Sequence, residues 1–466
     1  MNNPKPELSI TAVKIQGLFG YLTHEIELNK DHAVFIHGPN GCGKTTTLYL
    51  IYAFLGFRFD ILHETRFDSI SISFDDGTML IVRKVKLSKK SQLPLRFNED
   101  DDINDRAALE LAKDTPSLRF EFIRNNKFED SVELPWSKSR PDPQEISRYY
   151  PFLRRVAPRE WRNIATGERI RYSDIIERYR IPIAAFDIDL PEWLTVRLNA
   201  TSVRFIRTQR LFELTEFSLT PFENEDSTEL PKISPIQYCS NEIKKMISIK
   251  RTEQSDISQS SDSTFPERLL NIDPEFVPNE SDVRSGFEDN EKKIQDLVEA
   301  GLIAEQGVIK LPKSNLSPTQ LQVINLYLDD MNKKLEVFDD LHIKIKTFLG
   351  IISDKFKNKK IFITRQDGIK VILKNDLGDL ELDELSSGEQ HQIVLFFELI
   401  FLTTEKTLFL VDEPEISLHA DWQRSFVDDL ESVKTLGHCQ FLIATHSPQI
   451  IGNHIDWAQA LDGGIL

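Results

Sequence analysis

The pattern of apolar and polar positions over residues 1–90 predicts short strands around one helix. Apolar and polar residues alternate in SISISF at 69–74, and Asp76-Gly77 then turns the chain into TMLIVRKVKL, which is typical of a β-hairpin. A continuous apolar run, AVFIH at 33–37, precedes a glycine-rich turn and the helical pattern TTTLYLIYAFLG. We therefore predict a first α/β lobe in this part of the chain.

The middle of the chain carries weaker patterns. Residues 91–200 show no motif and are predicted to form an insert, after which residues 201–211 predict a return strand followed by a break. The pattern over 212–350 is helical and predicts an arm. Within it, residues 250–290 are rich in Ser, Asp and Glu and poor in large apolar residues, so we expect a flexible acidic loop there.

Clearer signals follow this acidic segment. Residues 288–302 and 318–349 are amphipathic, and the second stretch opens with Ser317 as N-cap and Pro318 at the first helical position. Over residues 351–466 the chain first shows a hairpin pattern, with KKIFITR and IKVILKN joined by an Asp-Gly turn. It then alternates helical and apolar strand patterns, which predicts a second lobe.

Composition and charge narrow the class of protein. The chain has 466 residues, 40% of them hydrophobic, which is enough for two or three packed domains. Acidic residues exceed Lys and Arg by 17, so the surface as a whole repels nucleic acid and acidic membranes, and any nucleic-acid contact must be local. The longest apolar run, 393–402, contains Glu398, and we see neither a membrane segment nor an export signal. Three widely spaced cysteines (Cys42, Cys239 and Cys439) suit no disulfide framework or zinc cluster and favour a cytoplasmic protein.

The turn after the first apolar strand carries a phosphate-binding pattern. Residues 38–45 read GPNGCGKT and fit GxxxxGK(S/T) between a strand and a helix. Glycines let backbone N–H groups point at phosphates, the helix N-terminus adds its positive end, Lys44 reaches the terminal phosphates and Thr45 holds magnesium. The predicted nucleotide contacts are Asn40, Gly41, Gly43, Lys44, Thr45 and Thr46. The pattern thus predicts binding of ATP and Mg²⁺.

Two later strands end in polar side chains that suit the same chemistry. TLFLVDEPE at 407–415 contains Asp412, a candidate magnesium ligand, and Glu413, a candidate base that orients the attacking water. QFLIATHSP contains His446, whose imidazole is suited to sense or hold the γ-phosphate. A histidine after a strand is often structural, but the carboxyl ends of parallel strands meet at one edge of a sheet. We therefore predict one shared site, with Glu413 and His446 as catalytic residues.

A second anion-binding turn stands at 385–390, where LSSGEQ opens an apolar helix pattern. A Ser-Ser-Gly turn at a helix start presents N–H groups and a hydroxyl, and its alternative role is an ordinary helix N-cap. Because the chain already has one phosphate loop, we predict that this turn caps the γ-phosphate of an ATP held by a second copy of the chain. ATP then joins the copies into a homodimer or a higher even oligomer.

In order and wording, GPNGCGKT, LSSGEQ, VDEPE and ATHSP are similar to the Walker A, signature, Walker B and switch-histidine motifs of ABC-type ATPases. The resemblance implies an α/β fold, namely an ABC-type P-loop ATPase head with a mixed sheet flanked by helices and an antiparallel β subdomain, interrupted by a long insert and a helical arm. The roles it implies are phosphate binding by Lys44 and Thr45, contact in trans by Ser386, Ser387, Gly388 and Glu389, magnesium binding by Asp412, catalysis by Glu413 and switching by His446.

The chain departs from this family pattern at one position and matches it loosely at another. Ser387 stands where the signature LSGGQ has its first glycine, which is expected to weaken or slow closure. Gln209 in FIRTQRL resembles the Q-loop glutamine, a contact to both the nucleotide and its metal, because the strand ends just before a helical arm. A surface glutamine is the alternative interpretation.

The spacing of the motifs favours one branch of these ATPases. Lys44 and Ser386 are separated by most of the chain, whereas transporter ATPase domains have only a small helical insert between the corresponding residues. DEPEISLHA is similar to the SMC and RecF branch, and ATPases of this length and motif wording resemble the Septu-type antiphage ATPase subunit. That resemblance implies a separate HNH nuclease subunit as partner and, in some cases, association with retrons. The alternatives are an SMC/RecF-like ATPase of DNA repair or maintenance and the ATPase subunit of a transporter.

The chain itself is not expected to carry the nuclease centre. No histidine lies between His63 and His342, which argues against an HNH or metallo-hydrolase cluster in the insert.

A basic, aromatic stretch offers a place for DNA, RNA or a protein partner. From Arg148 to Arg180 the chain has nine arginines against four acids, interleaved with six aromatic residues. Arginine planes and aromatic rings suit contact to phosphates and bases, or a protein hot spot. The alternative is a solvated helical face whose Tyr and Phe side chains line a core. RKVKLSKK at 83–90 is interpreted as a solvated strand edge or a phosphate contact.

Overall fold

The chain folds into two compact units that are interleaved along the sequence. The structure is a computed structural model, and it describes residues 8–85, 116–135, 143–157, 160–164, 169–171, 175, 190–207, 214–215, 232–273, 275–305, 311–374, 378–403, 406–416 and 418–461. The first unit comprises Met1–Thr208, Phe217–Pro231 and Thr403–Leu466, and the second comprises Gln209–Glu216 and Lys232–Leu402. The second unit is therefore an excursion of the chain from within the first.

A parallel sheet with strand order β11-β17-β18-β3-β19 forms the centre of the first unit. Its strands are β3 (Val34–His37), β11 (Ser202–Ile206), β17 (Lys406–Asp412), β18 (His438–Ala444) and β19 (Ala458–Ala460). Every side chain of β17 from Thr407 to Asp412 is buried, which is the continuous apolar pattern of a parallel core strand. The predicted α/β fold class is confirmed. All pairings in this sheet are parallel, so the antiparallel strands lie in a sheet of their own.

That antiparallel sheet has the order β2-β1-β4-β5-β6-β7. Its strands are β1 (Ile10–Leu18), β2 (Leu22–Glu27), β4 (Ser69–Phe74), β5 (Thr78–Val85), β6 (Ser117–Arg124) and β7 (Lys127–Leu134). The predicted hairpin of β4 and β5 is confirmed, and Gly77 at its turn has a left-handed φ of 75°. Strands β6 and β7 differ from prediction, because they extend this sheet although residues 91–200 were expected to be an insert. The apolar and polar pattern of β6 and β7 does not distinguish strands that extend this sheet from strands of a separate insert.

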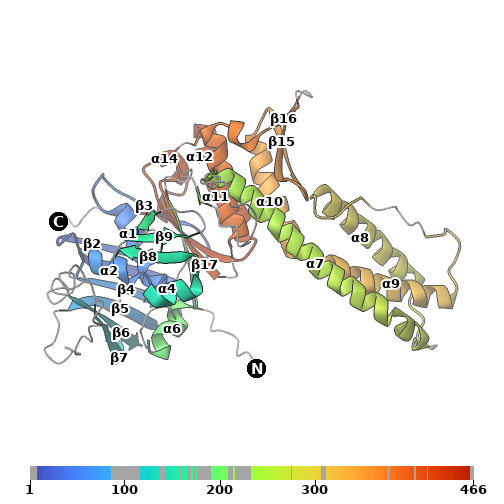
Figure 1. Ribbon diagram of the computed structural model, residues 1–466, viewed down its shortest axis with the longest axis horizontal. Helices are drawn as coiled ribbons and strands as arrows, with labels where there is room; N and C mark the ends of the chain where they lie inside the picture. The colour runs from blue at the N-terminus through green and yellow to red at the C-terminus, as the bar shows by residue number, and fades with distance from the viewer. Residues whose placement is uncertain are drawn as a thin grey trace. The chain divides into compact units, whose positions relative to one another are not determined.

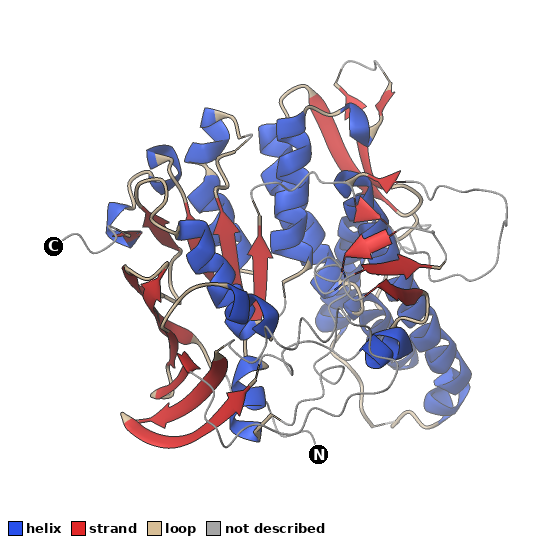
Figure 2. Ribbon diagram, turned by 60° about the vertical axis from the view of Figure 1, so that its left-hand side comes forward, coloured by secondary structure: helices blue, strands red, loops and turns tan. Residues whose placement is uncertain are grey.

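Helix α1 (Lys44–Leu55) joins the cores of both sheets. Leu48, Ile51 and Phe54 are fully buried, and the ring of Phe54 lies 5.9 Å from that of Phe120 in β6. On its other side the helix packs against β17 and β18. A helix that is apolar all round belongs inside a core, and Figure 2 shows helices lying beside the strands.

A small subdomain of the first unit holds the described part of the basic stretch. Strands β8 (Leu153–Ala157), β9 (Glu160–Asn163) and β10 (Arg169–Arg171) form an antiparallel sheet beside helix α4 (Pro143–Tyr149). Trp161 is fully buried at the centre of its small core. Among the residues that the structure describes, the other helices of the unit are α2 (Phe59–Glu64), α6 (Glu192–Leu198), α12 (Ala420–Arg424), α13 (Phe426–Lys434), α14 (Pro448–Ile451) and the 3₁₀ turn Ile455–Trp457.

The second unit is organised around α7 (Pro235–Leu270), a helix of 36 residues that packs against α9 (Pro318–Glu336), which packs in turn against α8 (Glu280–Glu299) (Figure 1). Ser234 caps it by accepting the N–H of Gln237. Its first turns bury Ile236, Ile243 and Ile247, which lie on one face of the helix. This apolar face anchors the helix to the body of the unit.

The predicted flexible loop at 250–290 is wrong. Its residues form the outer half of α7 and the start of α8, with a turn between them. Few large apolar side chains are buried there, and a segment of that composition is typically disordered. The segment continues a helix that is already nucleated and anchored by its apolar first turns, and elongating a helix costs little once it has started.

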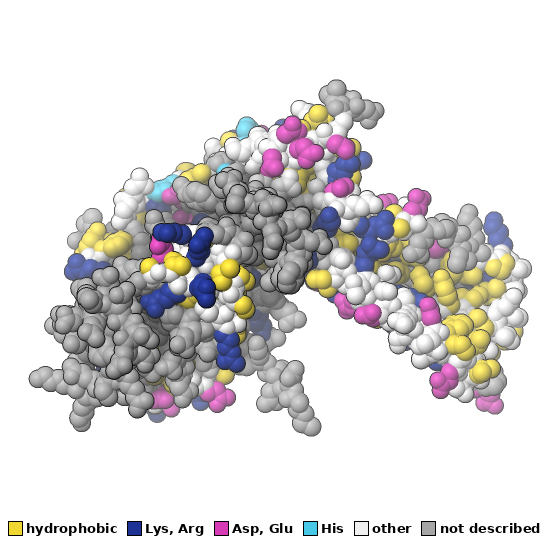
Figure 3. Space-filling view, viewed as in Figure 1, with side chains coloured by type: hydrophobic (Ala, Val, Ile, Leu, Met, Phe, Trp, Pro, Cys, Tyr) yellow, Lys and Arg dark blue, Asp and Glu magenta, His cyan; other side chains and the backbone are white. Residues whose placement is uncertain are grey.

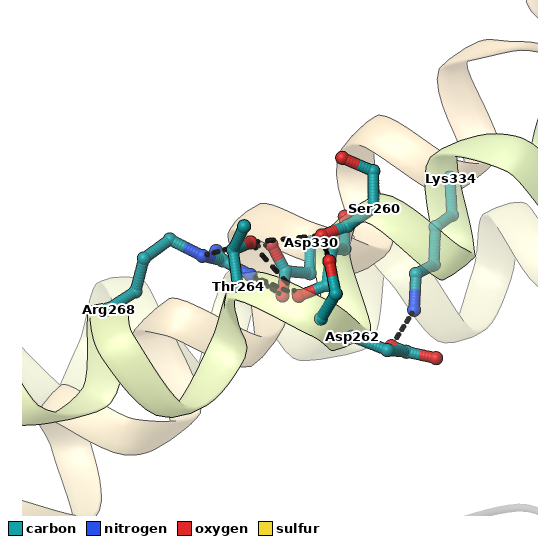
Figure 4. A network of polar contacts seen from close by, with 8 residues as sticks. Ser260, Asp262, Thr264, Arg268, Asp330 and Lys334 are labelled. Atoms are coloured by element: carbon teal, nitrogen blue, oxygen red, sulfur yellow. Dashed lines mark hydrogen bonds and ion pairs between the residues drawn. The ribbon is translucent and has the colours of Figure 1, made fainter.

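Polar contacts between α7 and α9 support this outer half, as Figure 4 shows. The guanidinium of Arg268 donates to both carboxylate oxygens of Asp330, at 2.6 and 2.8 Å, and Asp330 is buried. Lys334 in α9 donates to Asp262 at 3.0 Å. A two-pronged Arg–carboxylate pair fixes orientation as well as distance. The arm is thus held by side chains that the sequence analysis associated with a loop.

The rest of the second unit follows the predicted pattern with one change. The predicted helix at 318–349 is two helices, α9 and α10 (Asp339–Lys355), while the capping box of Ser317 and Gln320 confirms its start. The predicted hairpin is formed by β14 (Lys359–Thr364) and β15 (Gly368–Leu373). Its remaining elements are β12 (Leu214–Thr215), β13 (Lys232–Ile233), β16 (Asp379–Leu380), the 3₁₀ turn Leu382–Glu384 and α11 (Ser387–Phe401). Across the described ranges, no helix has both the length and the apolar character needed to span a bilayer.

Candidate nucleotide site

The turn between β3 and α1 is a compact loop shaped by two glycines. Gly41 and Gly43 have φ values of 84° and 87°, which L side chains rarely adopt. A Cβ on Gly43 would also come within 2.8 Å of the Leu18 side chain. A Cβ on Gly41 would have no atom within 4 Å, so the backbone of Gly41 is open on that side. Exposed Asn40 lies in the same turn.

The N-terminus of α1 is arranged to receive an anion. Its N-cap is Gly43, no side chain caps the helix, and the first turn contains no acidic residue. The first N–H groups of a helix have no partner within it, and the positive end of the helix dipole lies there. Thr46 belongs to this first turn. Both features favour a phosphate at this position.

Lys44 is folded against the loop from which it arises. Its side chain is buried, and its ammonium donates to the carbonyl oxygens of Gly38 at 3.0 Å and of Pro39 at 3.4 Å. These bonds hold a positive charge inside the curve of the loop. An ammonium so placed adds an attractive charge to the N–H groups of the turn.

Thr45 and Asp412 meet although most of the chain separates them. The Thr45 hydroxyl donates to Asp412 Oδ1 at 3.0 Å and is 3.1 Å from Oδ2. Asp412 is the last residue of β17, and the parallel sheet brings that strand end to the edge where α1 begins. A hydroxyl and a carboxylate are oxygen ligands of the kind that Mg²⁺ takes beside nucleotide phosphates. The donor set therefore fits Mg²⁺ and ATP.

Glu413 and His446 lie side by side at the ends of β17 and β18. His446 Nε2 is 4.0 Å from Glu413 Oε1, and both side chains are partly exposed. Glu413 has an unusual φ of 43°, and its N–H donates to the carbonyl of Ala444 at 2.8 Å. Such conformations persist where surrounding contacts fix them, and they concentrate at functional sites. The strand ends thus present a carboxylate and an imidazole together.

Glu415, for which the sequence motifs predict no role, lies three residues after Asp412. Its Oε1 accepts the backbone N–H of His446 at 2.6 Å, and its Oε2 accepts the Thr445 hydroxyl at 2.9 Å. The available signal was the second glutamate of VDEPE, whose contacts depend on a segment 30 residues further on.

His24 is a second residue without an assigned role. It is buried in β2, and its Nε2 lies 2.8 Å from the carbonyl oxygen of Cys42 in the phosphate loop, which requires the ring nitrogen to donate. Burial disfavours the charged ring and lowers the pKa of His24 below its usual value, although the bond to Cys42 acts in the opposite direction. A neutral imidazole thus supports the phosphate loop through its hydrogen bond to the carbonyl of Cys42. No local motif marks this histidine.

The predicted signature turn lies in the second unit, at the start of α11. Ser386 is the N-cap and forms a capping box with Glu389, whose carboxylate accepts the N–H and hydroxyl of Ser386 at 2.9 and 2.8 Å. Lys359 at the start of β14 donates to both oxygens of Glu389 at 2.7 Å. Ser387 and Gly388 form the first turn of the helix.

The charge of Glu389 is stabilised by these contacts. Burial alone would raise its pKa, but the bonds from Lys359 and Ser386 outweigh burial and hold the pKa below its ordinary value. Glu389 therefore remains a carboxylate near neutral pH.

Two further predictions concern residues only partly covered by the structure. Gln209 lies outside the described residues. In the basic stretch, Arg154, Arg155 and Arg162 are exposed on the small sheet, and Figure 3 shows Lys and Arg side chains gathered over it. Trp161 is a core residue and not a stacking platform, because its ring fills the space between α4 and the sheet.

One comparison with known proteins, the match to a family model, agrees with a nucleotide site. The family model described as AAA ATPase domain matches residues 9–451. A solved Smc head domain from Pyrococcus furiosus, with an extended coiled coil and bound to the C-terminal domain of ScpA, is 13% identical; the match covers 96% of this chain and 92% of that chain, with a TM-score of 0.35. An SmcHead bound to the C-winged helix domain of ScpA is 12% identical over 95% and 91% of the two chains, with a TM-score of 0.33. No curated protein matches this chain.

Proposed function

The chain belongs to the AAA ATPase domain family, and on this premise we propose that it binds ATP with Mg²⁺ and hydrolyses ATP between two copies of itself. The observation that carries the proposal is the contact between the Thr45 hydroxyl and the Asp412 carboxylate. It joins a helix N-terminus suited to phosphates with a strand end suited to magnesium.

Each candidate residue then has a task. Backbone N–H groups of the loop and first turn (Asn40, Gly41, Gly43, Thr46) cradle phosphates, and Lys44 adds its charge. Thr45 and Asp412 hold Mg²⁺, which offsets negative charge on the phosphates. Glu413 orients the attacking water, and His446 senses the γ-phosphate. Ser386, Ser387, Gly388 and Glu389 of a second copy complete the site, while Gln209 is proposed as a further contact to nucleotide and metal.

The test is the mass of the particle in solution with ATP and Mg²⁺. Glu413→Gln removes the water-orienting carboxylate but keeps the side-chain shape, so it should bind ATP, hydrolyse it 10²–10⁴-fold more slowly, on the order expected for loss of a general base, and accumulate as a pair. Lys44→Ala should remain at the mass seen without nucleotide. Light scattering coupled to gel filtration measures both. Equal masses for the two variants with ATP would reject the two-copy site.

We also propose a biological role, control of a separate nuclease subunit in antiphage defence. The residues of the motifs, which resemble those of the Septu-type ATPase subunit, support this role. The three cysteines are free and buried, which suits a reducing compartment. Phage plating on cells that express the chain with its neighbouring reading frames tests it. Protection that Lys44→Ala abolishes supports defence. A wild-type chain that gives no protection but restores resistance to DNA damage in a deletion strain would favour the SMC/RecF-like repair alternative.

The exposed arginines of the small sheet favour a nucleic-acid contact as a part of this role. Arg154, Arg155 and Arg162 lie on an otherwise acidic protein, so their attraction for phosphate is local. Arg154→Glu with Arg162→Glu should weaken binding of DNA or RNA and reduce the slope of its salt dependence by about 0.9 for each phosphate that the protein no longer neutralises. Fluorescence anisotropy at several salt concentrations measures this. An unchanged slope would exclude this surface.

A further inference from the structure

We propose that Glu415 is a positioning residue that fixes the backbone of His446, and this inference rests on the proposed ATPase function. The carboxylate uses both oxygens on adjacent residues of one loop. Oε1 accepts the His446 N–H at 2.6 Å, and Oε2 accepts the Thr445 hydroxyl at 2.9 Å. Glu415 thereby ties the turn after β17 to the loop after β18.

The loop needs such a tie because strand pairing ends just before it. The parallel register of β17 and β18 ends at Asp412 opposite Ala444. The N–H of Thr445 still donates to Ile36 in β3 at 3.1 Å, but His446 lies beyond the ladder. At that point the Glu415 carboxylate accepts the N–H that a neighbouring strand would otherwise accept.

A chain of hydrogen bonds extends the support beyond His446. The buried Thr445 hydroxyl donates to Glu415 and accepts the N–H of Ser447 at 2.9 Å. The Ser447 hydroxyl in turn donates to Gln423 at 2.6 Å. His446 is therefore held from both sides while its imidazole stays partly exposed beside Glu413. Preorganised groups of this kind contribute to rate because less reorganisation is needed during reaction.

Replacing the carboxylate by an amide should loosen this loop without disturbing the core. A carboxylate accepts at both oxygens, whereas the side chain of Glu415→Gln accepts at only one. Its NH₂ group would face either the His446 N–H, another donor, or the Thr445 hydroxyl, whose O–H would then lose the acceptor that Glu415 provides. Shape is retained, so the effect should be confined to residues 445–447.

The experiment is steady-state ATP hydrolysis by the full chain. Glu415→Gln should lower kcat at least about tenfold and leave KM for ATP within about twofold, because the phosphate loop is untouched. Thr445→Val should act in the same direction, and Thr445→Ser should restore most of the rate, because it returns the hydroxyl. Glu129→Gln, an exposed glutamate on β7 of the same unit, is the matched control and should match wild type.

Two results would overturn the inference. One is an unchanged kcat for Glu415→Gln when wild type is active, and the other is a loss that appears only in KM. Amide exchange separates this failure from failure of the ATPase proposal. If wild type hydrolyses no ATP, faster exchange at 445–447 in Glu415→Gln, with unchanged exchange in α1, still upholds the positioning role. Unchanged exchange there would reject it.

Discussion

The chain contains two helix N-termini proposed to contact nucleotide, one its own and the other the nucleotide of a second copy, and they differ in how they are capped. The helix α1 follows Gly43, with no side chain over its first turn. The helix α11 follows Ser386, whose hydroxyl and N–H are both engaged by Glu389, which is itself held by Lys359. Both helices are largely buried behind their first turns, so the difference lies at the exposed ends.

This difference predicts distinct behaviour toward a phosphate. At α1 no side chain caps the first N–H groups, so a phosphate can accept from them without displacing a side-chain partner. At α11 the Ser386 hydroxyl must exchange an internal partner for an external one, which offsets part of the energy gained. The turn before α1 is therefore expected to bind nucleotide by itself. The turn before α11 is expected to add contacts to a nucleotide that is already bound to another copy.

The largest expected effect comes from removing the charge at the first turn. Lys44→Ala should weaken ATP–Mg²⁺ binding by about tenfold to more than a hundredfold, because a charged hydrogen bond contributes roughly 1.5–3 kcal/mol. Ser386→Ala should leave the affinity of the single chain within about twofold. Calorimetric titration at low protein concentration measures both. If the two variants lost affinity equally, the distinction between the turns would disappear.

A smaller effect is expected on the local stability of the second turn. Ser386→Ala removes the N-cap of α11 and should lower its local opening free energy by about 1 kcal/mol. Amide exchange in the first turn of α11 should then be about fivefold faster. The matched change at the other helix, Gly43→Ala, is unsuitable, because a Cβ there would strike Leu18. Thr46→Ala is a better control and should leave exchange in α11 unchanged. Unaltered exchange in Ser386→Ala would show that the capping box contributes little.

The smallest expected effect is a difference in pH dependence between the turns. Because burial lowers the pKa of His24, the unfolded chain takes up a proton below about pH 6.5 that the folded chain resists. The first unit should therefore lose stability as pH falls from 7 toward 5.5. His24→Gln keeps a donor for Cys42 but cannot titrate, so it should flatten this dependence. Thermal unfolding at the two pH values provides the measurement. If wild type and His24→Gln lost stability equally as the pH fell, the proposed role of His24 would be contradicted.

The second turn should respond only at lower pH. Glu389 has a lowered pKa, so its contribution is complete above the ordinary carboxyl pKa of about 4.3 and is lost as pH falls through the folded pKa beneath it. Exchange in the first turn of α11 should therefore be insensitive to protonation of Glu389 between pH 7 and 5.5, after correction for intrinsic rates. If amide exchange in the first turn of α11 did change between pH 7 and 5.5, and Glu389→Gln removed that change, the lowered pKa of Glu389 would be contradicted.

Features that depend on neighbouring residues could be predicted from the sequence alone. Turn chemistry and periodicity act over a few positions, so local features can be predicted from them. These features are the strand, glycine turn and helix of the phosphate loop, the hairpins at Gly77 and Gly368, and the Ser317 cap. The types and order of the residues proposed to bind nucleotide are also visible in the sequence, because residue type and spacing define the phosphate-binding pattern.

Contacts that join distant segments could not be predicted from the sequence and became visible in the folded chain. The meeting of Thr45 with Asp412, the brace from His24 and the tie from Glu415 depend on which strands become neighbours in the sheet, and no local pattern encodes that order. The outer half of α7 was missed for the same reason, because its support comes from Asp330 and Lys334 on another helix. Short-range propensity fixes the elements, whereas long-range burial and polar pairing select the partners of each element.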